Sequence, residues 1–207
     1  MTETLIKATG TTGSTAILEN VLFERIGRTA FDLTFTHVNL TQVHVTECND
    51  VSNKAASIVN VTDGSLLVDQ SVFEKSNNSL WATCVRGPAI FSNTIFRENW
   101  MDCAIRGGSL NGAGLRASFE QNNVTFTNMT FINNTSFNNT EAVTKNAGDG
   151  AALNIQTTGS NFRVNGSVFS NNTSNRDGAH FYLNAQNSTF TIENTELSFG
   201  STPTGES

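Results

Sequence analysis

The side chains that could carry acid–base or nucleophilic chemistry are few and widely spaced in this sequence. The histidines are His37, His44 and His180. No serine or cysteine stands at a spacing from them that would pair a nucleophile with its base, as covalent catalysis requires. We therefore expect each histidine to be a surface or turn residue, with His37 and His44 on different walls or opposite faces of the fold.

The acidic side chains do not form an evident pair. Glycoside hydrolysis needs two carboxyl groups facing each other across a groove, and polysaccharide lyases need calcium-binding carboxylates beside a basic residue. The nearest approach is Asp102 with Arg97 and Arg106, which we interpret as a solvated face. Other acids precede glycine, as turn residues do; these are Asp63, Asp149 and Asp177. The sequence predicts no catalytic residue, and a polysaccharide lyase or glycosidase with an atypical site is the alternative.

Cysteine usage gives no sign of a metal site. The chain has three cysteines, Cys48, Cys84 and Cys103, an odd number without close spacing. Such a pattern is neither a disulfide framework nor a zinc site. We expect buried small hydrophobic residues, or one disulfide with a leftover thiol, and we expect no cofactor or metal.

Two features point to carbohydrate instead. Trp81 and Trp100 are candidate glycan contacts if they neighbour each other at one edge, although packing in the core or a turn is the preferred explanation. The second feature is a set of Asn-x-Ser/Thr acceptors for N-glycosylation, which ordinary turn chemistry also explains. These begin at Asn39, Asn60, Asn77, Asn123, Asn128, Asn133, Asn134, Asn138, Asn165, Asn171, Asn172 and Asn187.

Composition excludes several partners. The formal charge is −6 and no basic run occurs, so nucleic acid and anionic membrane surfaces are not expected partners. No apolar run approaches the roughly 20 residues needed to span a bilayer. The first residues lack the basic and apolar regions of a signal peptide. We expect an extracellular or cell-surface segment whose signal or anchor lies outside this chain.

Phenylalanine supplies the clearest repeat. The chain has 15 Phe but one Tyr, a bias typical of aromatic rings stacked inside. Apolar residues that close one strand recur at Phe23, Val45, Phe73, Phe96, Phe131, Phe169 and Leu197. Small or turn residues that open another strand recur at Ala30, Ala56, Ala82, Ala104, Ala152 and His180. Both series indicate a repeat of about 22–28 residues, with one enlarged repeat whose extra residues form loops at 107–114 and 138–148.

Within each repeat, apolar and hydroxyl residues alternate, as in Val124-Thr125-Phe126-Thr127 and Thr189-Phe190-Thr191-Ile192. Alternating strands without helical periodicity at this spacing predict an all-β parallel β-helix, with three short strands in each of about six to seven rungs. The phenylalanines should stack in one column. Asn99, Asn134 and Asn172 should form an amide ladder beside it.

The motifs carry a resemblance. Phe96-Arg97-Glu98-Asn99, Phe131-Ile132-Asn133-Asn134 and Phe169-Ser170-Asn171-Asn172 match the F-x-x-N motif of polymorphic outer-membrane-protein repeats. Gly87-Pro88-Ala89-Ile90, Gly150-Ala151-Ala152-Leu153 and Gly178-Ala179-His180-Phe181 are similar to their G-G-A-[IL] motif. The resemblance implies a pectin-lyase-like, right-handed parallel β-helix, a fold common in surface adhesins, over about residues 15–200.

We divide the chain into a partial rung or loop at 1–14, a β-helix at 15–199 and a tail at 200–207. The expected function is that of a non-catalytic structural spacer or adhesin segment that contacts glycans or other surface proteins. An open solenoid end exposes unpaired strand edges, so end-to-end contacts with another β-helix are expected as well.

Overall fold

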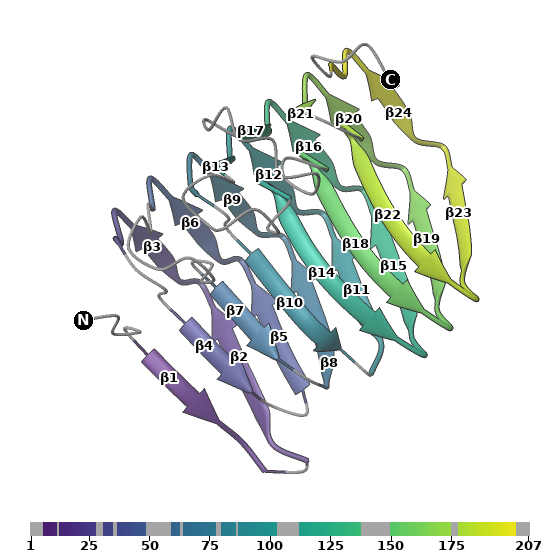
Figure 1. Ribbon diagram of the computed structural model, residues 1–207. Coiled ribbons are helices and arrows are strands. Elements are labelled where there is room, and N and C mark those ends of the chain that lie inside the picture. The colour runs from purple at the N-terminus through teal and green to yellow at the C-terminus, as the bar shows by residue number, and fades with distance from the viewer. Residues whose placement is uncertain are drawn as a thin grey trace.

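A computed structural model describes residues 6–11, 13–27, 31–34, 37–48, 59–62, 64–77, 80–85, 87–102, 112–137, 150–174 and 178–201. The described residues form strands and turns without any helix, and all strands pair in parallel. Each strand pairs with its counterparts one coil earlier and one coil later, so the chain winds as a parallel β-helix, as the sequence predicts (Figure 1).

Three walls of seven strands and one short wall of three make up the β-helix. Sheet A contains β1 (Ile6–Thr9), β4 (Phe31–Thr34), β7 (Val59–Thr62), β10 (Leu80–Val85), β14 (Leu115–Glu120), β18 (Leu153–Thr158) and β22 (Phe181–Gln186). Sheet B contains β2 (Thr15–Glu19), β5 (His37–Thr41), β8 (Ser65–Asp69), β11 (Ala89–Ser92), β15 (Asn123–Thr127), β19 (Asn161–Asn165) and β23 (Thr189–Glu193).

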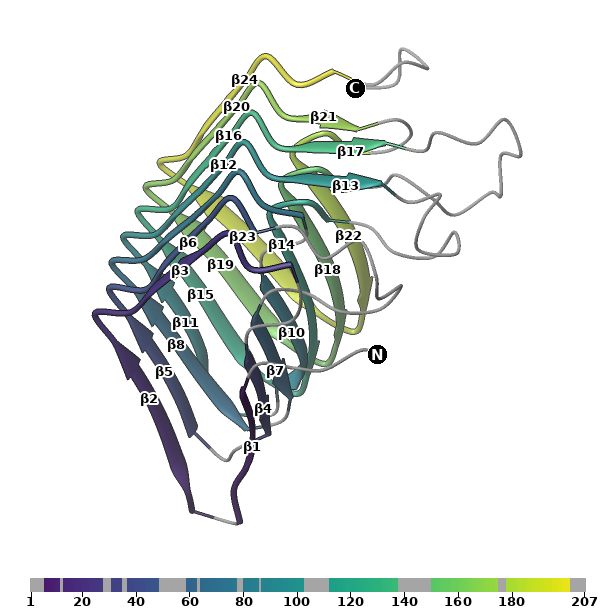
Figure 2. The ribbon, with the colours of Figure 1, turned by 90° about the vertical axis from the view of Figure 1, so that its left-hand side faces the viewer.

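The strands of sheet C are β3 (Leu22–Glu24), β6 (His44–Thr46), β9 (Val72–Glu74), β12 (Ile95–Arg97), β16 (Thr130–Ile132), β20 (Val168–Ser170) and β24 (Glu196–Ser198). Sheet D contains β13 (Trp100–Asp102), β17 (Thr135–Phe137) and β21 (Thr173–Ser174). Sheets B and C meet at a sharp bend opposite sheet A, and the core lies between them (Figure 2). Sheet D is an addition to the three strands per rung that the sequence predicts.

Single residues in the left-handed conformation make the bends between sheets. At the bend between sheets B and C, for example, Gln42, Asn93 and Asn128 have φ of 54°, 49° and 52°. At the bend between sheets C and D, Asn133 and Asn171 have φ of 55° and 52°. Asparagine is enriched among non-glycine residues at positive φ, which explains why it recurs at these turns.

The predicted phenylalanine column is confirmed. Sheet C aligns Phe23 with Val45, Phe73, Phe96, Phe131, Phe169 and Leu197 in the predicted order. The rings of Phe73, Phe96, Phe131 and Phe169 stack at centroid distances of 4.8, 5.0 and 4.7 Å. Each stacked pair adds about 0.5–1.5 kcal/mol beyond the burial of its area. A second column, which the sequence reading missed, stacks Phe91, Phe126, Phe162 and Phe190 on sheet B.

The predicted asparagine ladder is also confirmed. The Oδ1 of Asn134 accepts hydrogen bonds from the backbone N and the Nδ2 of Asn99, at 3.2 and 3.1 Å. The Oδ1 of Asn172 accepts from the same two groups of Asn134, at 3.0 and 2.9 Å. Each Nδ2 also donates to the carbonyl of a column phenylalanine, as Asn134 does to Phe96 at 3.0 Å. All three amides are fully buried, so the ladder satisfies groups that water cannot reach.

The expectation of one enlarged repeat is wrong, because two consecutive repeats are enlarged. Hydrogen bonds join successive coils at separations of 22, 28, 23, 35, 38 and 28 residues. Leu115 pairs with Leu80 on one side and with Leu153 on the other, so the extra residues are divided between the coil from Leu80 to Leu115 and the coil from Leu115 to Leu153. The predicted loops at 107–114 and 138–148 lie mostly outside the described residues; they belong to these two different coils.

The series of strand-opening residues is correct at Ala152 and His180, which directly precede β18 and β22, but it is wrong at Ala82. Ala82, expected before a strand, lies inside β10 in register with Val61 and Ala117. Gly87, matched to the glycine motif, precedes β11 on sheet B, not a sheet A strand. The glycine that occupies the motif position is Gly112, which shares positive φ with its counterparts in the next two coils, Gly150 and Gly178. A side chain at Gly150 would place its Cβ 2.6 Å from the Leu153 carbonyl oxygen, which explains the glycine there.

Candidate functional site

The outer face of sheet A carries ranks of polar side chains near the carboxyl ends of its last strands. Parallel pairing places Gln156 beside Ser118 and Asn184. The same register places Thr158 beside Glu120 and Gln186. The inward residues Phe119 and Thr157 between these ranks are buried, because successive strand residues alternate between the two faces.

These two ranks line a hollow of about 200 Å³ in the surface. Its lining comes from three adjacent coils, namely Ser118, Phe119, Glu120, Gln156, Thr157, Thr158, Asn184 and Gln186. The described side chains that line it are mainly amides and hydroxyls, with Glu120 as their one carboxylate. Amides and hydroxyls both donate and accept hydrogen bonds and do not titrate near neutral pH, so this lining suits a polyhydroxylated ligand more than acid–base chemistry.

The two tryptophans do not come together as a glycan platform. Trp81 lies in β10 on sheet A, and Trp100 lies in β13 on sheet D. The Arg116 guanidinium sits 4.6 Å from the centre of the Trp81 ring, and the ring packs against buried Met101 and Ala113. Trp100 stacks on Phe137, with ring centres 6.1 Å apart. Both rings therefore make packing contacts, which is the explanation preferred over glycan binding from the sequence.

A charged cluster lies on sheet C around Glu74. Arg97 donates a hydrogen bond from its Nε to Glu74 at 2.5 Å. The side chains of Asp102 and Arg106, with which Arg97 was grouped from the sequence, are not among those described. His44 contacts the other carboxylate oxygen of Glu74 through its Nε2 at 2.9 Å. The Glu74 side chain is only 8% exposed, and burial by itself would raise the pKa of its carboxyl. The hydrogen bonds from Arg97 and His44 outweigh burial and lower that pKa below its ordinary value.

The Glu74 cluster predicts a pH dependence. A carboxyl whose pKa is lowered by folding stabilises the protein above its unfolded pKa of about 4.3, and that stability is lost as the pH falls through the folded pKa. We expect Glu74→Gln to flatten the fall in unfolding free energy between about pH 5 and the onset of acid unfolding. Urea unfolding at a series of pH values measures this slope. Arg97→Met should flatten it too, whereas an unchanged slope in both variants would contradict the assignment.

The other two histidines stand apart from the hollow and from each other. His37 is exposed on sheet B, where its Nδ1 lies 2.6 Å from the Ser65 hydroxyl. His37 and His44 thus occupy different walls, as predicted. His180 is a half-buried turn residue whose Nδ1 lies 3.2 Å from the Nδ2 of Asn172, and burial lowers the pKa of its imidazole. One coil after Asn172, the ladder position is occupied by Gly200, which has no side chain, and the His180 ring lies in the space beside it. A Cβ at Gly200 would lie 2.8 Å from His180 Nε2. The asparagine ladder therefore ends at His180.

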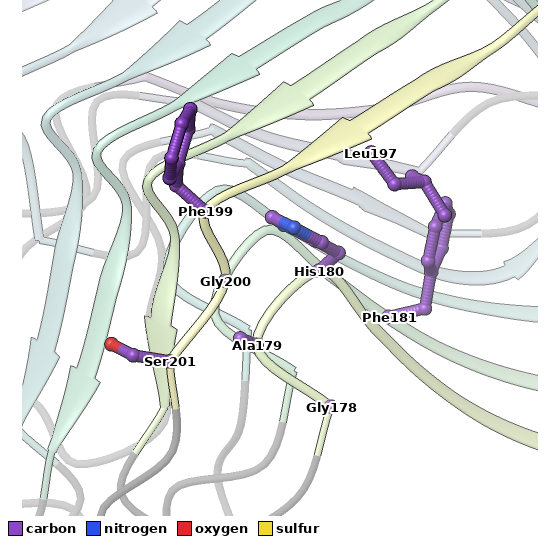
Figure 3. A pocket seen from close by; sticks show the side chains of 8 residues that line it. All are labelled: Gly178, Ala179, His180, Phe181, Leu197, Phe199, Gly200 and Ser201. Atoms are coloured by element: carbon purple, nitrogen blue, oxygen red, sulfur yellow. The ribbon is translucent and has the colours of Figure 1, made fainter. Parts of the chain in front are cut away.

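The C-terminal end of the β-helix holds a second hollow, of about 310 Å³. Figure 3 shows the His180 ring between Phe199 on one side and the Leu197 and Phe181 side chains on the other. This hollow is mainly apolar because the last coil leaves its inward residues uncovered: Leu197 is 50% exposed, while Phe169 beneath it is fully buried. It is the open end of the core, with no titratable lining group other than His180 among the described residues.

The N-glycosylation acceptors fall into distinct environments. Asn77, Asn134 and Asn172 are buried, and Asn39 and Asn165 are half-buried within strands. The exposed acceptors are Asn123, Asn128, Asn133, Asn171 and Asn187. Asn138 lies outside the described residues, and the same holds for the side-chain surroundings of Asn60.

The described ranges contain neither a metal-ligating cluster nor a membrane-spanning helix. There, no three or more His, Cys, Asp or Glu side chains gather where they could hold a metal ion. In the same part of the chain, no helix is long and apolar enough to cross a membrane. Cys48 is buried and free, in keeping with the expected small hydrophobic residue. Asp63, Arg106, Cys103, Asp149 and Asp177 lie outside the described residues, and the side chains of Cys84 and Asp102 are not described.

Comparisons with protein-family models, with curated proteins and with solved structures find no match to this chain. Any proposal about function therefore rests on the fold and on the two hollows.

Sequence reasoning missed the polar hollow because Ser118, Gln156 and Asn184 stand 38 and 28 residues apart and share no motif. The sequence did contain one indication of the hollow, because each of these residues lies three positions after the first residue of its strand. Those first residues are Leu115 in β14, Leu153 in β18 and Phe181 in β22.

Proposed function

We propose that this chain is a non-catalytic β-helix module of an extracellular or cell-surface protein, and that it binds neutral glycans at the polar hollow on sheet A. The observation that carries the proposal is the register of Ser118, Gln156 and Asn184 beside Thr158 and its neighbours. Three coils thereby align hydroxyls and amides in a fixed array. A preformed array of this kind binds sugar hydroxyls at a low entropic cost, because the backbone ladders already hold it in place.

Charge supports a neutral ligand. Glu120 lies at the hollow, and the whole chain has a formal charge of −6. A carboxylate or sulfate on the ligand would be repelled, and no lysine or arginine lines the described hollow to bind it. Uncharged polyhydroxyl ligands meet no such penalty.

The F-x-x-N repeats support placing the chain near polymorphic outer-membrane-protein repeats and the right-handed, pectin-lyase-like β-helices of surface adhesins. The Phe and Asn positions of that motif are the ones stacked in the column and in the ladder. On this proposal the β-helix acts as a rigid spacer. The apolar C-terminal hollow supports end-to-end contact with another β-helix, through the strand edges of the last coil.

A binding experiment tests the proposed function. We expect the chain to bind members of a panel of neutral oligosaccharides, and the doubly substituted Gln156→Ala, Asn184→Ala variant to bind about tenfold more weakly or worse. Losing two hydrogen-bonding side chains removes roughly 1–3 kcal/mol of binding free energy. Thr125→Ala is the matched control, since Thr125 is a half-buried strand residue on the outer face of sheet B.

The outcomes separate the proposal from the alternative. Binding that is equal in the double variant and in Thr125→Ala would remove the hollow from the proposal. Incubation of the chain with neutral and acidic polysaccharides, with and without calcium, should release no reducing ends and no unsaturated product. Release of either product would make the polysaccharide lyase or glycosidase the better hypothesis.

A further inference from the structure

The bend between sheets C and D places two N-glycosylation acceptors side by side. Asn133 and Asn171 each follow a sheet C strand and each begin an Asn-Asn-Thr triplet. The pairing of Phe131 with Phe169 aligns the two turns, and the backbone N of Asn133 donates to the Ser170 carbonyl at 3.1 Å. Since adjacent strands lie about 4.8 Å apart, the two asparagines are neighbours on the surface although 38 residues separate them.

Both side chains are presented to solvent. Asn133 and Asn171 are exposed, and both are left-handed residues of the bend, with φ of 55° and 52°. Neither amide side chain has a hydrogen-bond partner among the residues that the structure describes. Two of the other three exposed acceptors are engaged: Asn128 donates to Asn93 at 3.3 Å, and Asn123 accepts from Asn161 at 3.2 Å.

The residues that directly follow behave in the opposite way. Asn134 and Asn172 also begin Asn-x-Ser acceptors, yet both are fully buried in the ladder. The Nδ2 of Asn134 donates to the Phe96 carbonyl at 3.0 Å and to Asn172 at 2.9 Å, so both of its hydrogens are in use. An oligosaccharide on this nitrogen would break the ladder and prevent the coil from closing.

We propose that Asn133 and Asn171 form a paired N-glycan attachment site, of which one member is modified in each folded molecule. In the reaction, Nδ2 of the asparagine forms a bond to the anomeric carbon of a lipid-diphosphate-linked oligosaccharide. The bond between that carbon and the diphosphate oxygen breaks, the diphosphate leaves with the electron pair, and the transferase takes the amide proton. Two branched oligosaccharides attached about 4.8 Å apart would overlap, so doubly modified chains are expected not to complete folding.

Secretion of the whole chain from eukaryotic cells tests this proposal, with attachment sites mapped by mass spectrometry of enzymatically deglycosylated peptides. We expect partial modification at both Asn133 and Asn171, and intact masses in which this pair carries one glycan. Asn171→Gln should raise the modification of Asn133 to near completion, and Asn133→Gln should do the same for Asn171. Glutamine suits the comparison because Gln42, Gln70 and Gln121 already occupy left-handed turns of this chain.

Thr135→Ala is a further control, because it removes the Asn133 acceptor and leaves the one at Asn134, which ends at Ser136. We expect no glycan on Asn134 in the folded protein secreted from this variant. A glycan there, folded molecules that carry glycans on both Asn133 and Asn171, or no glycan on either would each overturn the proposal. The outcome is independent of glycan binding at the sheet A hollow, which lies on another wall of the β-helix.

Discussion

Replacing Phe131 by alanine is expected to lower the free energy of unfolding by about 3–5 kcal/mol, the range for a buried aromatic side chain. The Phe131 ring is fully buried and stacks on Phe96 at 5.0 Å and on Phe169 at 4.7 Å. Its removal leaves a cavity in the middle of the column. The neighbouring coils cannot close that cavity, because the ladder hydrogen bonds fix their spacing. Chemical denaturation measures the loss.

The matched control for this prediction is Thr127→Ala. Thr127 lies on the neighbouring strand, β15, with its side chain half-buried on the outer face. We expect its replacement to change the unfolding free energy by no more than about 0.5 kcal/mol, as is usual for surface substitutions. Equal losses in the two variants would mean that the column does not stabilise the β-helix in the way its geometry indicates.

Replacing Asn134 by leucine is expected to have an effect of similar size. The substitution keeps the number and branching of the side-chain non-hydrogen atoms but removes the acceptor for two groups of Asn99 and the donor to the Phe96 carbonyl and to Asn172. The Asn99 backbone N–H loses this buried acceptor, whereas Asn99 Nδ2 still donates to the Phe73 carbonyl and Asn172 Oδ1 still accepts from the backbone N of residue 134. Each lost bond to a buried polar group costs about 1–3 kcal/mol. We expect a total loss of about 3–5 kcal/mol in chemical denaturation, with a lower thermal midpoint.

Asn133→Gly is the control that tests whether the asparagine in the turn, rather than the one in the ladder, stabilises the protein. Asn133 precedes Asn134 directly but is exposed at φ 55°, a conformation that glycine adopts without steric cost. The control is expected to lie within about 1 kcal/mol of the parent protein. If it were as unstable as Asn134→Leu, the turn rather than the ladder would be the stabilising element.

The column and the ladder also bear on the proposed function. They hold successive coils in one register along the whole β-helix, so outward side chains from different coils keep fixed relative positions. A polar hollow built from Ser118, Gln156 and Asn184 needs this rigidity, because each strand supplies only one member of a rank. Stability and presentation of the surface thus have the same physical origin.

The sequence by itself determined the repeating interior. Phe96, Phe131 and Phe169 each precede a ladder asparagine by three residues, and each pair was placed correctly from spacing alone. Inward positions of successive coils share one environment, a dry stack in which the same side chain fits every time. The same residue types therefore recur, and the repeat can be read without knowing any contact.

Tertiary structure alone decided the outward surface and the length of the enlarged coils. Arg97, for example, bonds Glu74, which lies 23 residues earlier and was not grouped with it from the sequence. The extra residues were assigned to one repeat between Ala104 and Ala152, and only the pairing of Leu115 with both Leu80 and Leu153 shows that two consecutive coils share them. Outward side chains face water, where no common neighbour selects one residue type. Their partners follow from the register between coils, which is fixed by backbone pairing across 22–38 residues and leaves no local pattern in the sequence.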